Sequence, residues 1–486
     1  MTTSRILISA VFALSCAACT VGPEYREPDV SLLTPDALST DPALRTETVE
    51  PANDWWRAFN DPELDRWIAR ALEQNRDLRV AAANVLASRA FLKFERTNLR
   101  PTGEASAAYE RRRLAGAAFG ADDVSFDDSN FYTVELASSW ELDFFGRVRR
   151  LTEAALADLS ASEALYRDAQ VLVIADTASA YVDWRGAALQ YDVARRNLDN
   201  QRATLEFTQI RLEEGVGTRL DVARAAAQVK TTEAAMPEFE ALRVAAANRL
   251  ATLTVQPVAA IETVAVNPER DTAASLPVLP ESLAIGDVET LLRRRPDVRA
   301  ADRLVAAATA RVGVAKADYF PRVTLTGTAS LSSQTFSGLD DSGAFCYGIG
   351  PQLVWTALDF PRVEARVAQS RANLEATYAA YEQTVLLVLQ ETQTAISNHG
   401  REITRFEALS EAARQSSDAA SLARLRFEDG ADDFLDVLDA ESRLLAAEAA
   451  EAQSRIAALR SFIEVYRSLG AGAQVIPAAQ SDEVSR

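Results

Sequence analysis

The sequence contains the same structural unit twice, and this internal repeat limits the fold more than any other feature. In residues 75–101 and 295–321, a short polar run is followed by an alanine-rich stretch and a proline at the same spacing. The runs RLEEG (211–215) and RFEDG (426–430) are each followed, four residues later, by Leu-Asp-Val. We therefore divide the chain into 1–18 (signal), 19–60 (N-terminal segment), 61–254 (first repeat), 255–285 (linker), 286–470 (second repeat) and 471–486 (tail).

Each repeat predicts the same order of elements: a helix, two strands, a very long helix, a glycine-marked break and a returning helix. The residue before a proline avoids the helical conformation, so the first helices end before Pro101 and Pro321. A continuous helix over 147–213 would be about 100 Å long at 1.5 Å per residue. Such a helix does not fit a compact domain, so we expect a coiled coil or a tube.

Four stretches alternate apolar and polar residues with the period of a β-strand. In residues 132–143, Tyr132, Val134 and Leu136 share one side, and Thr133 and Glu135 share the other. A soluble antiparallel sheet with one wet face would look the same, and the stretches are also about as long as a tilted membrane strand. The alternation alone leaves both interpretations open. The predicted strands are 102–113, 132–143, 322–333 and 348–358.

Two of the predicted long helices carry seams of mainly apolar residues at alternating three- and four-residue steps. Alanine in such a seam allows helices to approach closely. In the first long helix the predicted seam is Ala154, Ala157, Ala161, Ala164, Val171, Ala175, Ala178, Val182 and Leu189. In the last helix it is Leu435, Leu438, Ser442, Leu445, Ala449, Ala452, Ile456, Leu459, Ile463 and Tyr466.

The N-terminus has the pattern of an export signal. Arg5 precedes a short apolar run at 6–14, and small residues then lead to Cys16 or Cys19. In a lipoprotein signal, the retained cysteine becomes the acylated first residue. Ala-Ala-Cys at 17–19 fits that pattern, Cys16 is a competing site, and an ordinary cleaved signal is the alternative. We expect acylation of Cys19.

Composition argues against several classes of function. The formal net charge of −19 argues against nucleic acid as a partner. The chain has one histidine, His399, and if Cys16 leaves with the signal and Cys19 is acylated, Cys346 is the one free cysteine. Too few ligands then remain for a zinc site or a Cys–His dyad. We therefore expect no enzyme activity, no metal and no cofactor.

Beyond the signal no apolar run approaches 18 residues, so any membrane-spanning element must be β. Four strands cannot close a barrel, and an open edge is not tolerated in lipid, so copies of the chain must associate. Two copies would give about eight strands with a filled interior, and three would give about twelve with room for a lumen.

Four runs make the sequence resemble the outer-membrane efflux channel family typified by TolC and OprM, and most of all its NodT-like lipoproteins. They are CTVGPEYREP (19–28), WWRAFNDPEL (55–64), RRPDVRAAD (294–302) and GVAKADYFP (313–321).

The resemblance implies a mainly α fold with a β-barrel part. It implies a homotrimer with a twelve-strand barrel in the outer membrane, continued by a twelve-helix tunnel in the periplasm. An equatorial belt would come from the segments outside the repeats. The implied partners are outer-membrane lipid, a periplasmic adaptor (membrane fusion) protein and an inner-membrane resistance-nodulation-division pump.

An acidic helix face follows the second glycine break. Asp432, Asp436 and Asp439 lie at steps of four and three, which places them on one side of a helix. The ordinary interpretation is a solvated surface. The resemblance instead implies that Asp436 and Asp439 form carboxylate rings at a periplasmic gate, with Asp221 in the matching place of the first repeat. The family's closing arginine, four residues before the first of these aspartates, is replaced here by Asp432.

The two breaks are the predicted tips of the helical hairpins. A helix–helix turn that needs glycine explains them in part, and the resemblance adds contact with the adaptor. The tip residues are Gly215, Val216, Gly217, Thr218, Gly430, Ala431, Asp432 and Asp433.

Loops 114–130 and 334–345 would join strands on the outer side, and the first is acidic, so a cation site and a variable soluble loop are both open. A type I secretion exit duct and a trimeric coiled-coil stalk remain alternative functions. A periplasmic adaptor is a third, although adaptors have one helical hairpin and this chain has two.

Overall fold

A computed structural model describes residues 20–473 except 36, 39–41, 43, 114–126, 266–275, 430, 432 and 433. The chain divides into two compact units. One contains the described parts of 1–28, 84–163 and 300–382, and the other contains those of 29–83, 164–299 and 383–486. Four helices, which cover residues 76–97, 147–213, 296–317 and 360–428, contribute residues to both units.

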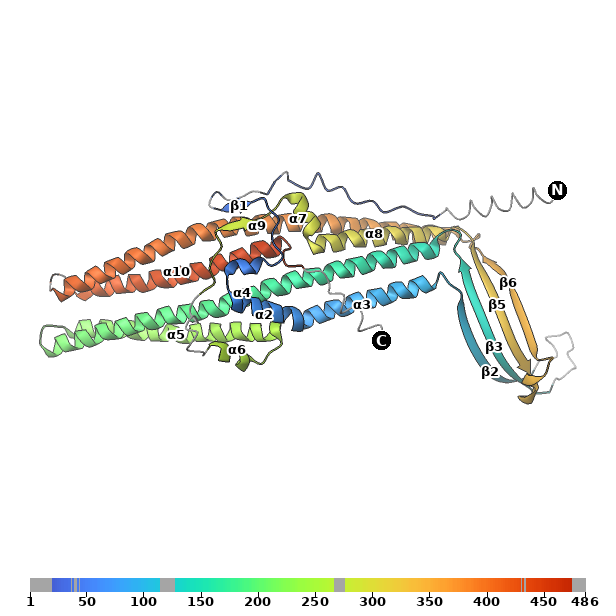
Figure 1. Ribbon diagram of the computed structural model, residues 1–486, viewed down its shortest axis with the longest axis horizontal. Helices are drawn as coiled ribbons and strands as arrows, with labels where there is room; N and C mark the ends of the chain where they lie inside the picture. The colour runs from blue at the N-terminus through green and yellow to red at the C-terminus, as the bar shows by residue number, and fades with distance from the viewer. Residues whose placement is uncertain are drawn as a thin grey trace. The chain divides into compact units, whose positions relative to one another are not determined.

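The elements follow the same order in both repeats (Figure 1). The first contains α2 (Pro62–Gln74), α3 (Arg76–Thr97), β2 (Thr102–Arg112), β3 (Ser129–Leu142), α4 (Arg147–Glu213) and α5 (Arg219–Thr254). The second contains α7 (Val288–Arg294), α8 (Pro296–Ala317), β5 (Arg322–Ser333), β6 (Phe345–Val354), α9 (Phe360–Glu428) and α10 (Phe434–Ser468). The mainly helical fold and its order agree with the sequence prediction. Among the described residues, no helix has the length and apolarity that crossing a membrane requires.

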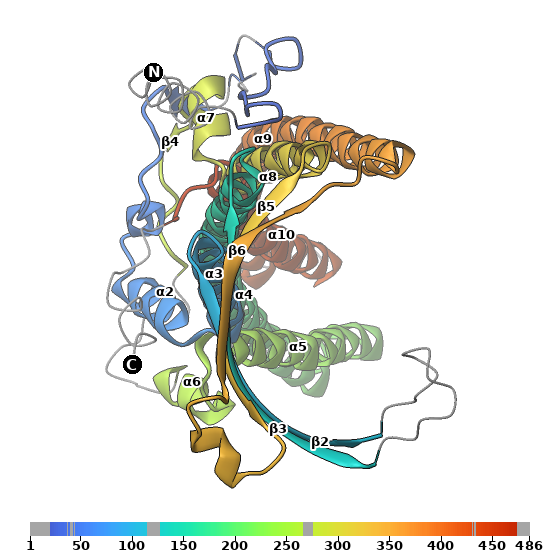
Figure 2. The ribbon, with the colours of Figure 1, turned by 90° about the vertical axis from the view of Figure 1, so that its right-hand side faces the viewer.

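The four strands form one curved antiparallel sheet in the order β2-β3-β5-β6 (Figure 2). The register aligns Ala107, Val134, Leu331 and Phe345 in one row across the sheet. It aligns Ser106, Glu135, Ser330 and Cys346 in a neighbouring row, on the opposite face. The apolar sides of all four strands therefore form one continuous face, and the polar sides form the other.

Two strands and one loop differ from the prediction. β3 begins at Ser129 instead of Tyr132, so residues 129 and 130 belong to the strand and not to the preceding loop. β6 begins at Phe345 instead of Gly348 and ends at Val354, before Leu358. The strand stops there because the chain turns into α9, and the Trp355 indole donates a hydrogen bond to the Tyr319 carbonyl (3.1 Å). The expected outer loop 334–345 contains a short 3-10 helix, η4 (Ser337–Asp340).

The first helix predicted in each repeat is in fact two helices, joined at Asn75 and at Arg295. The Asn75 side chain accepts hydrogen bonds from the backbone of Asp77 and Leu78, as an N-cap does. Arg295 donates to the Ser468 carbonyl at the end of α10 (2.8 Å). Each joint residue thus ties a helix end to its surroundings, which hydrophobic spacing does not reveal.

The predicted seam of α4 is confirmed, because its members from Ala154 to Val182 are all buried. The seam predicted for the first half of α10 is wrong by one residue. Leu435 is 53% exposed, and the buried stripe instead contains Phe434, Val437, Glu441 and Leu444. The charged Glu441 interrupts the apolar pattern and made the Leu435 seam look more regular.

The segments outside the two repeats also form structure. They contain η1 (Trp55–Phe59), α6 (Val258–Ala265) and a parallel pair of short strands, β1 (Arg45–Glu47) and β4 (Ser282–Ala284). The aromatic rings of η1 pack against α10: Trp55 stacks on Tyr466 at 5.2 Å, and Phe59 lies 5.1 Å from Phe462.

Candidate functional site: the hairpin tips and the N-terminal strap

The first tip is a closed turn between α4 and α5. Gly215 has a φ of +77°, which favours glycine. Val216 N–H donates to the Arg211 carbonyl (2.9 Å). Thr218 begins α5 with a capping box, in which its hydroxyl donates to Asp221 (2.6 Å) and accepts from the Asp221 backbone (3.2 Å). Asp221, a predicted gate residue, therefore already has a structural role at the helix start.

The second tip repeats part of this geometry. Ala431 N–H donates to the Arg426 carbonyl (2.8 Å), as Val216 does to Arg211. Asp436 is the third residue of α10, as Asp221 is of α5. The predicted tip residues Gly430, Asp432 and Asp433 lie outside the described residues, so the acidic face is described only at Asp436 and Asp439.

Both described aspartates of that face are exposed. Asp439 forms an ion pair at 3.0 Å with Arg443, which lies four residues later in α10. Among the described residues, no ion pair or hydrogen bond joins Asp221 to Asp436 or Asp439. The structure places Asp436 and Asp439 on one face of α10 and Asp221 at the start of α5.

An aromatic cluster holds the two tips together. Phe427, Phe434, Val437 and Ala225 form a buried core contributed by α5, α9 and α10. The Arg211 guanidinium of α4 lies over the Phe427 ring at 4.6 Å, within the range of a cation–π contact.

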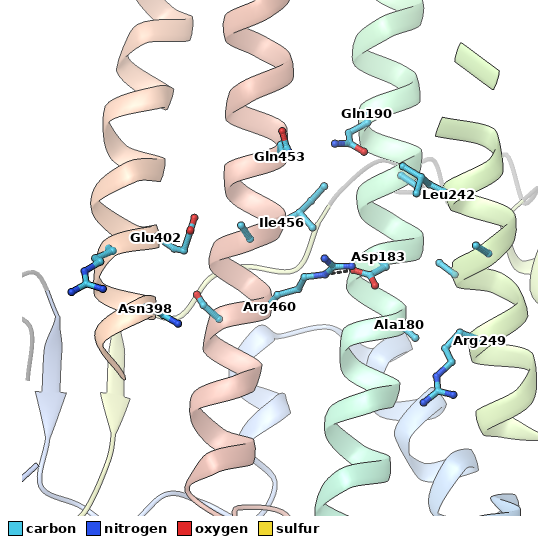
Figure 3. Close-up of a pocket in the computed structure, with 16 residues that line it drawn as sticks. Ala180, Asp183, Gln190, Leu242, Arg249, Asn398, Glu402, Gln453, Ile456 and Arg460 are labelled. Atoms are coloured by element: carbon cyan, nitrogen blue, oxygen red, sulfur yellow. Dashed lines mark hydrogen bonds and ion pairs between the residues drawn. The ribbon is translucent and has the colours of Figure 1, made fainter. Parts of the chain in front are cut away.

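A groove of about 860 Å³ lies along the four long helices of the same unit. Figure 3 shows side chains from α4, α5, α9 and α10 at this groove. Asp183 of α4 and Arg460 of α10 form an ion pair there, and Gln190 and Gln453 also line it. Its mixture of polar and small apolar side chains suits a wet surface.

The segment after Cys19 is a strap that docks on the sheet-bearing unit. Cys19 itself lies outside the described residues. Val21 N–H donates to the Phe145 carbonyl (3.1 Å), and Arg150 donates to the Val21 carbonyl (3.3 Å). A Cβ on Gly22 would lie 2.4 Å from the Gly313 Cα, so glycine is needed at position 22, where the strap crosses α8.

Tyr25 fixes the strap at a second place on α8, about two to three turns nearer to the start of that helix than Gly313. Its ring packs on Ala157, Ala306 and Ala307. Its hydroxyl donates to Asp302, and the Arg303 guanidinium lies 5.1 Å from the ring centre. Burial, together with the bond to Asp302, raises the pKa of the Tyr25 hydroxyl well above its usual value, so it stays a donor.

The strap brings together three runs that are far apart in the sequence: 19–28, 294–302 and 313–321. The family model described as outer membrane efflux protein matches residues 67–255 and 288–471, both repeats of this chain. The chain belongs to the outer membrane efflux protein family.

Several relatives match nearly the whole chain. The nodulation protein T of Rhizobium leguminosarum bv. viciae is 30% identical, over 91% of this chain and 88% of that protein. The outer membrane protein OprJ of Pseudomonas aeruginosa is 30% identical, over 95% of each. Among solved structures, the outer-membrane channel OprN superposes with a TM-score of 0.83 at 38% identity, covering 94% of this chain and all of that one. The open state of the Neisseria gonorrhoeae MtrE channel superposes with a TM-score of 0.81 at 29% identity, covering 94% of this chain and 99% of that one.

Within this outer membrane efflux protein, sequence reasoning missed one residue near the tips. Glu441 is 5% exposed. One of its oxygens accepts from Arg424 (2.8 Å) and from Thr204 (3.0 Å), which joins α10 to α9 and α4. Glu441 lies four residues after Val437 and three before Leu444, and this helical spacing could have placed it on the buried stripe.

Among the described residues, no group of three or more His, Cys, Asp or Glu side chains is placed to hold a metal ion.

Proposed function

We propose that three copies of this outer-membrane efflux protein form a passive exit duct, with a closed barrel of twelve strands and a helical tunnel. The observation that carries the proposal is the sheet. Its apolar face is exposed, since Leu136 is 59% and Ile349 is 75% accessible. A soluble sheet would cover such a face, whereas lipid is a fitting solvent for it.

The sheet edges support association. β2 and β6 are each paired on one side only among the described residues. All neighbouring strands are antiparallel, so β2 and β6 run in opposite directions. β6 of one copy can therefore continue the antiparallel pattern on β2 of the next, which closes the ring without a free edge. Three copies leave room for a lumen, which the polar face would line.

The helices would then continue the duct into the periplasm. The groove side chains at the four long helices suit a water-filled wall. We assign the tips to contact with a periplasmic adaptor, which links the duct to an inner-membrane pump of the resistance-nodulation-division class. Asp436 and Asp439, repeated by symmetry, would form the gate. The chemistry is conduction, with no catalytic step.

Acylation of Cys19, after removal of residues 1–18, would anchor each copy in the outer membrane. The strap supports this, because Val21, two residues after Cys19, is held beside Phe145, at the junction of β3 and α4. Mass spectrometry of the N-terminal peptide tests the assignment. An unmodified Cys19, or acyl groups on Cys16, would contradict it.

The closed barrel can be tested by cross-linking through the native Cys346, an exposed thiol on the polar face of edge strand β6. We would place a second cysteine along β2, at Glu104, Ser106, Ala108 or Glu110 in turn, and oxidise the assembled protein. At least one of these positions should give covalent species that stop at three chains. Cysteines at Ala105 or Ala107, on the apolar face, are the control and should not cross-link. A ladder beyond three chains, or no cross-link at any polar position, would contradict the proposal.

A further inference from the structure

A cavity of about 390 Å³ lies beside the strap, where the sheet meets the helices. It is lined by the last turn of α8, the segment leading into β5, the first turns of α9 and Val21 of the strap. All of these belong to the sheet-bearing unit. Neither the gate, the tips nor the lipid anchor uses it.

Three charged side chains line the cavity: Lys316, Arg371 and Glu364. Among the described residues, none of the three has an ion-pair partner within 4 Å, although most arginines of this chain do. Lys316 is half-buried in the last turn of α8, where it also complements the helix dipole. The dipole accounts for one cation, but it does not account for a second cation and a carboxylate around the same cavity.

Glu364 and Arg371 are seven residues apart on α9 and so face the same side, two turns from each other. The cavity thus offers positive charge and negative charge separated along a helix. A single small anion would satisfy the cations and leave Glu364 repelling it. A ligand with a phosphate and an ammonium group a few bonds apart would satisfy all three.

The surroundings match the headgroup region of a bilayer. Phe320 stacks on Phe145 at 4.6 Å, and the cavity wall also includes Tyr319, directly before β5 and its apolar face. Nearby, the indoles of Trp140 and Trp355 donate to backbone carbonyls at this end of the sheet. Aromatic residues with one apolar and one hydrogen-bonding side are typical of membrane–water interfaces.

We propose that this cavity binds the headgroup of a zwitterionic phospholipid of the phosphatidylethanolamine type from the periplasmic leaflet. Lys316 and Arg371 hold the phosphate, Glu364 accepts from the ammonium, and the acyl chains pass over Phe320 towards the apolar sheet face. The orientation rests on the membrane placement under the proposed function.

The test is native mass spectrometry of the full-length protein from detergent, with phosphatidylethanolamine or phosphatidylglycerol added. The wild type should retain one phosphatidylethanolamine per chain. K316Q/R371Q should weaken that binding about tenfold or more, because two charge-assisted contacts to phosphate are lost. E364Q should weaken binding of phosphatidylethanolamine but not of phosphatidylglycerol, which lacks the ammonium.

The matched control is K93Q/R362Q, which removes the same two charges from exposed positions outside the cavity. Equal loss in this control, or no loss in K316Q/R371Q, overturns the proposal. Soluble phosphoethanolamine should compete with the lipid better than inorganic phosphate. Equal competition, with no effect of E364Q, would identify a free phosphate site and overturn the lipid assignment.

The same spectra separate this proposal from the channel proposal. A trimer that retains no lipid contradicts only the headgroup site. A monomer that retains lipid in a manner dependent on Lys316 and Arg371 contradicts only the assembly.

Discussion

His399 shows how a single buried side chain makes the stability of this protein depend on pH. It is 2% exposed, its Nδ1 lies 2.8 Å from the Ser461 hydroxyl, and its ring packs against Phe462. Burial lowers the pKa of His399 from 6.5 to about 4. The folded protein therefore keeps this imidazole neutral at pH values where the unfolded chain already binds a proton.

We expect acid to destabilise the protein through His399. The stabilisation is complete above pH 6.5 and is lost as the pH falls from 6.5 to 4, by up to about 3 kcal/mol per chain. H399Q, which cannot take up the proton, should lose less stability than the wild type between pH 7 and 4.5. Denaturation of both proteins in detergent at the two pH values measures the difference. An identical drop in the two proteins would show that His399 is not the group responsible.

The gate assignment is also a residue-scale prediction. Exposed carboxylates repeated around a narrow axis, within about 8 Å, would be only partly screened at physiological salt and would attract cations. D436A/D439A should abolish block by multivalent cations and leave assembly intact, because both residues are exposed. Asp436 should contribute more than Asp439, which Arg443 partly neutralises. Substitution of both by lysine should shift selectivity towards anions.

Single-channel recordings with cations added from the periplasmic side test this assignment. E238A/E240A, which removes two exposed carboxylates of α5, is the control and should keep the block. Block that persists unchanged in D436A/D439A would make the two aspartates an ordinary solvated face.

Among the helices and strands, those whose residue pattern follows from a single physical rule were predicted best from the sequence. The alanine seam of α4 and the alternation of β5 were predictable, because close helix packing and the pleat of a sheet each impose one period. Three-residue strands such as β1 and β4 are too short to show a period. The joints at Asn75 and Arg295 depend on hydrogen bonds to distant carbonyls, Leu253 and Ser468, which only the fold supplies.

At the candidate site, too, some features could be predicted from the sequence and others could not. The glycine of the first tip was predictable, because a left-handed backbone favours it. The strap and the two runs of α8 that it contacts were recognisable in the sequence as three separate runs. Their contact through Gly22, Gly313 and Tyr25 could not be predicted from the sequence. In α10 the Leu435 seam was wrong, since a charged Glu441 on the buried stripe is stabilised by Arg424 and Thr204 from other helices. No local rule anticipates such a partner.

We expect the Arg424–Glu441 pair to hold α9 and α10, the two arms of the second hairpin, together near their tip. R424M leaves the buried Glu441 carboxylate without its ion-pair partner, which typically costs about 3–5 kcal/mol. Amides near Arg424 and Glu441 should then exchange faster with deuterium. R424M/E441M removes both charges and should recover much of the protection. If R424M exchanges like the wild type, the pair does not hold α9 to α10.

At the scale of the whole molecule, the proposed repetition of the chain around an axis would account for features that are incomplete in one chain. A sheet with two open edges, an uncovered apolar face and long helices with a polar groove is incomplete as a monomer. In a closed assembly the same features become a lipid-facing wall, a lumen and a tunnel. The central claim is therefore that the assembled protein conducts.

Planar-bilayer recording of the purified wild-type protein tests that claim most directly. We expect discrete, uniform conductance steps, with cation-selective reversal potentials under a salt gradient and block by multivalent cations from the periplasmic side. The same preparation should have the mass of three chains in detergent. A trimer that inserts into the bilayer and gives no steps above those of protein-free membranes would contradict the account and favour a structural stalk.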